Sequence, residues 1–528
     1  MAIRDRPAQR DRRHHRGRSA GRGQEVLREG ELRGGHDGAA VKRLLVASLL
    51  TACAPAAIVT RPQEPLIAEP TRTAARQLPS ALDVDPTTIA APPLEFALRE
   101  PRIITLANGL QVYLLEDHTT PLVLLRALVN SGAVDEPADK LGLTSIMSSV
   151  LTTGGAGSKS PQELEEFLSF HAADLSAGTG DESSTVQLSI RSADLQTLLP
   201  VFADVLQRPR FDEKRFEIAR GRLLEVLRRR EDRPDSVASR ALSKAVFGPD
   251  SLLGREAVER TVKAVTLGDV KKFHAATWGA SSTRLIITGD FDATALQKLL
   301  EQHFASWKGG TAAVRNWGPE KPLQRRVIVV PRTIAQAKVR IGTFGYARRS
   351  ELEYPLRLAN TVLGTFGVGR LYREIRDEKG LAYSAYSSVG PGPTSGLFTA
   401  GFDTRPEQVG EALEAATRIL SGVSTNDAVT AAELRTAKDV ALNTFAFRFD
   451  GAAKIAFERA QLDLYDYPPD YLSTWRQKIS SVTVDALSKS SAQLDDGLQI
   501  IVVGPPGKLG DLSRFGPVST INDVEQFR

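Results

Sequence analysis

The two halves of this 528-residue sequence repeat one order of strand-like and helical segments. Each half has a strand, an amphipathic helix, a second strand and two more helical segments, at residues 122–129, 142–151, 185–190, 194–206 and 212–230, then at 337–344, 356–363, 395–402, 405–420 and 431–463. Late in each half an apolar strand is followed by glycine, in STRLIITGD at 282–290 and in LQIIVVGPP at 498–506. A repeated order of elements is typical of a duplicated unit. The sequence therefore predicts two similar α+β domains.

Six segments follow from this repeat and from local composition. They are a non-native or disordered leader at 1–40, a signal peptide at 41–53, a tether at 54–97, the first domain at 98–307, a linker at 308–322 and the second domain at 323–528. The tether contains eight prolines, which exclude long helices and favour extended chain. It would hold a folded body away from a membrane surface.

The positive charge of the chain belongs to its N-terminal leader. Residues 1–52 hold twelve Lys or Arg against six Asp or Glu, whereas the remainder is nearly balanced. The net charge of +5 therefore gives no support for a nucleic-acid interface in the folded body. Residues 1–40 are rich in Arg and Gly and contain no Phe, Tyr or Trp, a composition that cannot build a core.

The segment that begins at Val41 has the three parts of a secretory signal. VKRLLVASLLTA gives two cations, a short apolar run and small residues before Cys53, the single cysteine of the sequence. Leu50-Thr51-Ala52-Cys53 is similar to a bacterial lipobox, in which the cysteine is lipidated and becomes the mature N-terminus. We therefore expect translation to begin at Val41 and Cys53 to anchor the protein in the cell envelope, facing the periplasm, with the outer membrane preferred. A single cysteine also excludes an internal disulfide.

The stretch from Gly364 to Tyr386, GTFGVGRLYREIRDEKGLAYSAY, carries the most distinctive pattern. Its glycine-punctuated loop opens onto a charged helical segment that ends at Gly380, and a strand-like run follows. Arg376 and Tyr383 stand seven residues apart across that break. A guanidinium has a fork of N–H donors and a phenol has one O–H donor, so the pair suits the binding of a peptide carbonyl. No Gly-Lys-Ser or Gly-Lys-Thr follows the glycines, which argues against a phosphate-binding loop.

This stretch resembles the second-half motif of the pitrilysin, insulinase and mitochondrial-processing-peptidase family of zinc metallopeptidases. The resemblance covers roughly residues 98–515 and is strongest over 364–386. It implies two homologous domains, each a mainly antiparallel β-sheet with helices packed on one face. It also implies that Arg376 and Tyr383 line the substrate chamber opposite the metal. The alternatives are a surface ion pair of Arg376 with a neighbouring carboxylate and core packing of Tyr383.

The amphipathic helix at residues 142–151 lacks the metal ligands that the resemblance would lead one to expect. In the family, two histidines at i and i+4 hold zinc on this helix and a glutamate activates water. Those three positions are Ser145, Ser148 and Ser149 in this sequence. The remaining ligand position falls on or beside Glu225, and a zinc site takes three protein ligands. We therefore expect no metal cofactor in this chain.

No other arrangement of side chains replaces the lost ligands. The histidines after the leader are His118, His171, His274 and His303, and no two of them share an i, i+3 or i+4 spacing. The serines lack a Gly-x-Ser-x-Gly elbow, and the thiol of Cys53 belongs to the lipobox. The sequence therefore predicts a chain that does not act as a peptidase by itself.

Two hypotheses about function follow from the resemblance. In two-chain members of the family one subunit holds zinc and the other does not, which suggests a non-catalytic subunit of a heterodimeric periplasmic peptidase. A homologous partner with His-x-x-Glu-His would carry the zinc, and the two chains would enclose an unfolded peptide. Arg376 would bind the peptide backbone, and Tyr383 would donate to the oxyanion of the intermediate. The alternative is a structural or peptide-binding lipoprotein scaffold without a peptidase partner.

Overall fold

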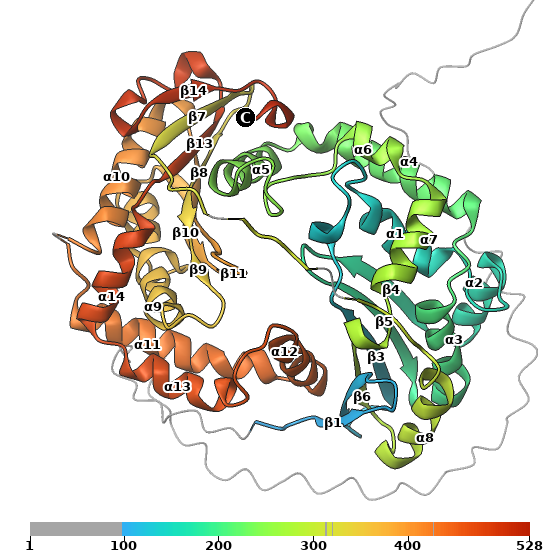
Figure 1. The fold of residues 1–528 in the computed structure, drawn as a ribbon. Coiled ribbons are helices and arrows are strands. Elements are labelled where there is room, and N and C mark those ends of the chain that lie inside the picture. The colour runs from blue at the N-terminus through green and yellow to red at the C-terminus, as the bar shows by residue number, and fades with distance from the viewer. Residues whose placement is uncertain (1–97, 312–313, 319, 426, 528) are drawn as a thin grey trace, which may run out of the picture. The chain divides into compact units, whose positions relative to one another are not determined.

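The structure is a computed structural model that describes residues 98–311, 314–318, 320–425 and 427–527. The predicted leader, signal peptide and tether, with Cys53, lie outside these residues. Two six-stranded sheets, one in each half of the described chain, organise the fold (Figure 1).

The first sheet has its strands in the order β1-β2-β6-β3-β5-β4. These strands are β1 (Arg102–Thr105), β2 (Gln111–Glu116), β3 (Leu122–Val129), β4 (Asp174–Thr179), β5 (Ser184–Arg191) and β6 (Thr283–Gly289). Strands β2 and β6 are parallel, and the other neighbours are antiparallel. The helices of this half are α1 (Leu143–Thr153), α2 (Pro161–Phe170), α3 (Leu195–Gln207), α4 (Glu213–Arg229), α5 (Pro234–Phe247), α6 (Glu259–Ala264), α7 (Leu267–Thr277) and α8 (Ala293–Phe304).

The second sheet has its strands in the order β10-β12-β8-β13-β7-β14. These strands are β7 (Arg326–Pro331), β8 (Ala337–Phe344), β10 (Ala382–Val389), β12 (Leu397–Thr404), β13 (Gln499–Gly504) and β14 (Val518–Thr520), and a small parallel pair is formed by β9 (Tyr346–Ala347) and β11 (Pro391–Gly392). The helices are α9 (Glu353–Gly364), α10 (Val409–Gly422), α11 (Ala431–Phe445), α12 (Ala452–Leu464), α13 (Tyr471–Ser481) and α14 (Val484–Ser491), with a π-helix at Tyr372–Glu378.

Five strands of each sheet share one topology, which confirms the predicted duplication. The sixth strand differs, because β1 starts its half and pairs antiparallel with β2, whereas β14 ends its half and pairs parallel with β7. In each half the last long strand, β6 or β13, lies between the first and second long strands and is parallel to the first. The second strand then pairs antiparallel with the fourth, and the fourth with the third, which forms the free edge. The predicted fold class, two homologous domains with mainly antiparallel sheets, is confirmed.

Each sheet packs one face on helices of its own half. In the first half the buried core joins residues of β3, β5 and β6 to apolar residues of α1, α3 and α8. In the second half the equivalent core joins β8, β12 and β13 to α9, α10, α11 and α13. The amphipathic spacing of the helix at 142–151 has this origin, because Ile146, Met147 and Val150 all face the sheet-side core.

The opposite face of each sheet carries a helix from the other half. Helix α5 of the first half packs on β8 and β13 of the second sheet, through Ala238, Ala241 and Leu242 (Figure 1). Helix α12 of the second half packs on β2, β3 and β6 of the first sheet, through Ala452, Ile455, Ala456, Ala460 and Leu464. We refer to this arrangement as the reciprocal helix exchange. The resemblance implied helices on only one face of each sheet, and the exchanged helices pack on the other face.

The exchange explains the continuous apolar run of LQIIVVG in the sequence. All six residues of β13 are buried. Ile500 and Val502 lie in the core with the helices of their own half, whereas Ile501 and Val503 lie in the cluster with α5. A strand covered on both faces has no solvent side, so it has no polar alternation.

A change of chain direction inside residues 431–463 makes the exchange possible. The sequence predicted one helical stretch there, but the structure has α11, the short 3-10 turn Ala446–Phe449 and then α12. Gly451 is the N-cap of α12, in extended conformation. At the far end of α12 the Tyr113 hydroxyl of β2 donates to Asp463 at 2.8 Å, and burial raises the pKa of that tyrosine.

Among the described helices, none combines the length and hydropathy that crossing a bilayer would require.

We expect Leu242→Ala to destabilise the whole folded body. Leu242 is 1% exposed, and its methyl groups fill the space above Gly342 of β8, where an added Cβ would lie 2.9 Å from Leu242 Cδ2. Removing a buried leucine side chain costs about 3 kcal/mol in the free energy of unfolding. Urea unfolding followed by circular dichroism measures this loss. Leu352→Ala, at a residue 39% exposed, is the control and should change the unfolding midpoint little. An equal effect of both changes would contradict the role assigned to the exchange.

Candidate functional site

The glycine-rich loop of the predicted motif connects α9 to the π-helix in a very narrow space. A Cβ added at Gly364 would lie 2.1 Å from the backbone nitrogen of Ser387 in β10, so only glycine fits. Gly367 has a φ of +81°, in the left-handed region that favours glycine. The glycines therefore serve close packing and a turn, as expected for a loop without a phosphate-binding role.

Arg370 fixes the start of the helical segment. Its Nε and Nη2 donate to the two carboxylate oxygens of Glu433 at 2.8 Å each, and its Nη1 donates to the carbonyl of Asp427 at 2.7 Å. The Arg370 hydrogen bonds lower the pKa of Glu433 to about 2. Because Glu433 also caps α11 by accepting from the backbone N–H of Thr430, this ion pair ties the motif to the N-terminus of that helix.

The charged segment is a π-helix over Tyr372–Glu378, which is wider than an α-helix. The side chains of Leu371 and Ile375 are buried in the core of the second half. Gly380, with a φ of +60°, ends the segment as predicted. The wider turn changes which side chains share a face. π-Helical turns are rare and occur often at functional sites.

Tyr383 lies at a second irregularity of the backbone, a bulge in the edge strand β10. Ala382 pairs with Thr404, but the next pair is Ala385 with Phe402, so the register shifts across the two residues between them. Both alanines are buried, while Tyr383 is 83% exposed. A bulge turns a side chain away from the regular alternation of a strand. Core packing of Tyr383, one of the two alternatives, is therefore wrong.

The structure brings Arg376 and Tyr383 together. The guanidinium carbon of Arg376 lies 5.4 Å from the ring centroid of Tyr383 and 4.6 Å from that of Tyr372. The alternative of a surface ion pair holds only weakly, because Asp377 Oδ1 is 3.8 Å from Arg376 Nη1. Among the described residues neither the Arg376 side chain nor the Tyr383 hydroxyl has a hydrogen-bond partner within the protein. Their donors are therefore free to bind a carbonyl or an oxyanion.

The helix that bears the three serines keeps its place without any metal ligand. Ser145 is exposed, Ser149 is half-buried, and Ser148 is 5% exposed with an Oγ that has no hydrogen-bond partner. The buried carboxylate of Glu136 caps the start of α1 by accepting from the backbone nitrogens of Gly142 at 2.8 Å and Thr144 at 2.6 Å. Apolar packing and this cap hold α1, so its fold does not require a metal.

Glu225, the predicted remnant of a ligand position, is engaged by arginines. Arg229 Nε donates to its Oε1 at 2.6 Å, and Arg228 lies 3.7 Å from its Oε2. Three neutral hydroxyls and one arginine-paired carboxylate do not match the imidazole, thiolate and carboxylate ligands that zinc takes. Within the described part of the chain, no group of three or more His, Cys, Asp or Glu side chains could hold a metal ion.

The four remaining histidines are not gathered into a site. His171 Nδ1 lies 2.9 Å from Asp194 and its ring packs on Phe167, as a structural histidine does. His118 pairs with Asp290, and buried His274 contacts the carbonyl of Leu206. None of these contacts reaches the Arg376–Tyr383 pair.

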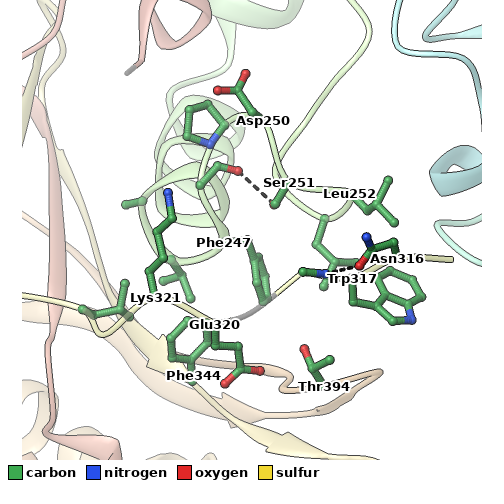
Figure 2. Close-up of a pocket in the computed structure, with 17 residues that line it drawn as sticks. Phe247, Asp250, Ser251, Leu252, Asn316, Trp317, Glu320, Lys321, Phe344 and Thr394 are labelled. Carbon is green, nitrogen blue, oxygen red and sulfur yellow. Dashed lines mark hydrogen bonds between the residues drawn. The ribbon is translucent and has the colours of Figure 1, made fainter.

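A cavity of about 530 Å³ lies elsewhere, where the end of α5 meets the linker and the end of β8 (Figure 2). Figure 2 shows Phe247, Phe344 and Trp317 among its walls, with Lys321 and Glu320 from the linker. It shares no lining residue with the predicted motif. Its lining mixes aromatic rings with charged side chains of the linker.

Sequence reasoning missed Tyr372 and Phe366. Tyr372 lies beneath Arg376, and Phe366 of the glycine-rich loop meets the Tyr372 ring edge-on at 4.8 Å. The spacing of four residues between Tyr372 and Arg376 could have indicated this contact, since residues at i and i+4 are neighbours on a helix. Phe366 gave no signal, because its position depends on the fold of the loop.

We expect the purified chain to bind no stoichiometric zinc, because Ser145, Ser148 and Ser149 provide neither imidazole nor carboxylate. Elemental analysis after gel filtration in zinc-containing buffer measures this directly. Glu225→Gln is the matched variant and should leave the metal content unchanged. One tightly held zinc per chain that is lost in Glu225→Gln would contradict the assignment.

Comparison with known proteins gives matches in both halves of the chain. The family description "Insulinase (Peptidase family M16)" fits residues 111–259, and "Peptidase M16 inactive domain" fits residues 264–440. An uncharacterised zinc protease of Mycobacterium tuberculosis is 26% identical over 351 residues, which are 64% of this chain and 78% of that protein. A second uncharacterised zinc protease, from Bacillus subtilis, is 25% identical over 340 residues, 63% of this chain and 81% of that protein.

Solved structures share the fold. A peptidase M16 inactive domain from Pseudomonas fluorescens superimposes with a TM-score of 0.70 at 20% identity, over 77% of this chain and 98% of its own. A protease from Helicobacter pylori gives a TM-score of 0.70 at 19% identity, over 78% of this chain and all of its own. The two-sheet architecture, the motif at 364–386 and the family matches agree, and the chain belongs to the M16 family of insulinase-like peptidases.

Proposed function

We propose that this chain is the non-catalytic subunit of a two-chain zinc peptidase in the cell envelope. One observation carries the proposal. Arg376 of the π-helix and Tyr383 of the edge strand β10 lie side by side with unused donors, while the helix at Leu143–Thr153 has serines in place of metal ligands. A chain that keeps the groups for binding a peptide but lacks those for activating water suits a shared active site.

The two donors would have separate tasks in such a site. A planar guanidinium can donate two N–H bonds to one or two backbone carbonyls, so Arg376 would bind an extended peptide. Tyr383 has one hydroxyl, which would donate to the oxygen that becomes negative in the tetrahedral intermediate. An unfolded peptide is the substrate that this pair fits, because its backbone carbonyls are not engaged in helix or sheet hydrogen bonds.

The partner would be a homologous chain that carries His-x-x-Glu-His and zinc. The relatives named as zinc proteases support this choice, since the wider family has chains with the metal chemistry that this one lacks. The scaffold alternative, a peptide-binding or structural lipoprotein without a peptidase partner, would apply if the paired enzyme did not depend on Arg376 or Tyr383.

We expect Tyr383→Phe and Arg376→Ala to differ in their kinetic effect on the reconstituted pair. Loss of the main oxyanion donor lowers kcat by about a hundredfold, and Tyr383→Phe removes only that hydroxyl. Arg376→Ala should also raise KM, because peptide capture weakens. Steady-state hydrolysis of a fluorogenic peptide by complexes verified as intact is the measurement.

The controls for this experiment remove the same kinds of group elsewhere in the second half. Arg435→Ala, at an exposed position of α11, and Tyr386→Phe, further along β10, should retain wild-type kinetics. Wild-type rates from both Tyr383→Phe and Arg376→Ala would reject the shared-site proposal and favour the scaffold.

We also propose that the protein is a lipoprotein anchored through Cys53 to the outer membrane and facing the periplasm. The lipobox-like Leu50-Thr51-Ala52-Cys53 after a short signal supports this proposal. Cys53→Ser should therefore move the protein from the detergent phase to the aqueous phase in a Triton X-114 partition. An unchanged partition, with a mature peptide that begins upstream of residue 41, would contradict the anchor.

A further inference from the structure

Tyr372 supports the face of the Arg376 guanidinium. Tyr372 is the first residue of the π-helix and is only 5% exposed, so its ring is fixed by the surrounding protein. The guanidinium carbon lies 4.6 Å from the centre of that ring, and Phe366 packs edge-on against the same ring. A cation over an aromatic face at this distance is attracted by the ring.

Arg376 has no other fixed partner among the described residues. Its side chain is 33% exposed, and Oδ1 of Asp377 lies 3.8 Å from its Nη1, too far for a hydrogen bond. Arg370, six residues earlier, shows the contrast, because Glu433 and Asp427 engage all three of its nitrogens. A carboxylate would hold Arg376 too, but only by occupying the donors that a substrate needs.

An aromatic ring holds a guanidinium without using those donors. The five N–H bonds of a guanidinium lie in its plane, whereas the ring contacts its face. We propose that Tyr372 is a positioning residue, which orders Arg376 through its ring and leaves the in-plane donors free for peptide carbonyls. The proposal rests on the shared-site function above and deepens it. Tyr383, at 5.4 Å, gives the guanidinium a second aromatic neighbour that is exposed and so is less fixed.

The kinetic test compares Tyr372→Leu with Tyr372→Phe in the reconstituted pair. Leucine removes the aromatic face and phenylalanine keeps it, so KM should rise between about 2-fold and 30-fold with leucine and return to the wild-type value with phenylalanine. Tyr354→Leu is the matched control, since Tyr354 of α9 is also 5% exposed but does not contact Arg376. A similar rise in KM from Tyr354→Leu would show that lost packing alone is responsible and would overturn the proposal.

A double-variant cycle separates positioning from general stability. If Tyr372 acts through Arg376, Tyr372→Leu should change KM no further in an Arg376→Ala background. An undiminished effect in that background would overturn the positioning role. If Arg376→Ala itself leaves the kinetics unchanged, the proposed function fails; if Arg376→Ala acts and Tyr372→Leu does not, only the positioning role fails.

A spectroscopic test needs no partner chain. The Arg376 Nε–H resonance, assigned by its loss in Arg376→Ala, should lie upfield in the wild-type protein because of the tyrosine rings. Tyr372→Leu should move that resonance downfield, and Tyr372→Phe should leave it in place. A resonance at the position of free arginine in the wild-type protein would overturn the proposal, whatever the kinetics show.

Discussion

The reciprocal helix exchange is the contact on which the rest of the structure depends. The central strands of each sheet, β6 and β13 above all, are apolar on both faces, and the helices of each half cover only one of these faces. Helices α5 and α12 cover the two remaining faces from across the linker. Because each half completes the core of the other, the duplicated units fold as one body. The packing of these two helices, more than the covalent linker, then holds the halves together.

Two departures from regular backbone geometry place the candidate site on this frame. The π-helix brings Arg376 over the ring of Tyr372, and the β-bulge turns Tyr383 out from the edge strand. Both irregular segments are fixed by buried neighbours, Ile375 on one side and Ala385 on the other. Strain or irregularity that a core tolerates beside free donors is typical of sites that bind a ligand.

Sequence reasoning reached the duplicated α+β fold, the motif and the missing ligands, because each depends on local pattern. The apolar run of β13 indicated a buried strand. The apolar spacing of Ile146 and Met147 indicated a helix, which fixed the positions of the three serines on it. The exchange could not be predicted, since an amphipathic helix such as α12 has the same sequence pattern whichever sheet it covers. The spacing of four residues could have indicated that Tyr372 and Arg376 are neighbours, but the π-turn itself and the bulge that exposes Tyr383 are set by packing with residues distant in the chain.

The way α1 is held has an evolutionary consequence. Its N-terminus is capped by Glu136 and its inner face is apolar, so neither the cap nor the apolar packing uses the hydroxyls of Ser145, Ser148 or Ser149. A lineage could therefore exchange metal ligands for serine at these positions without losing the fold.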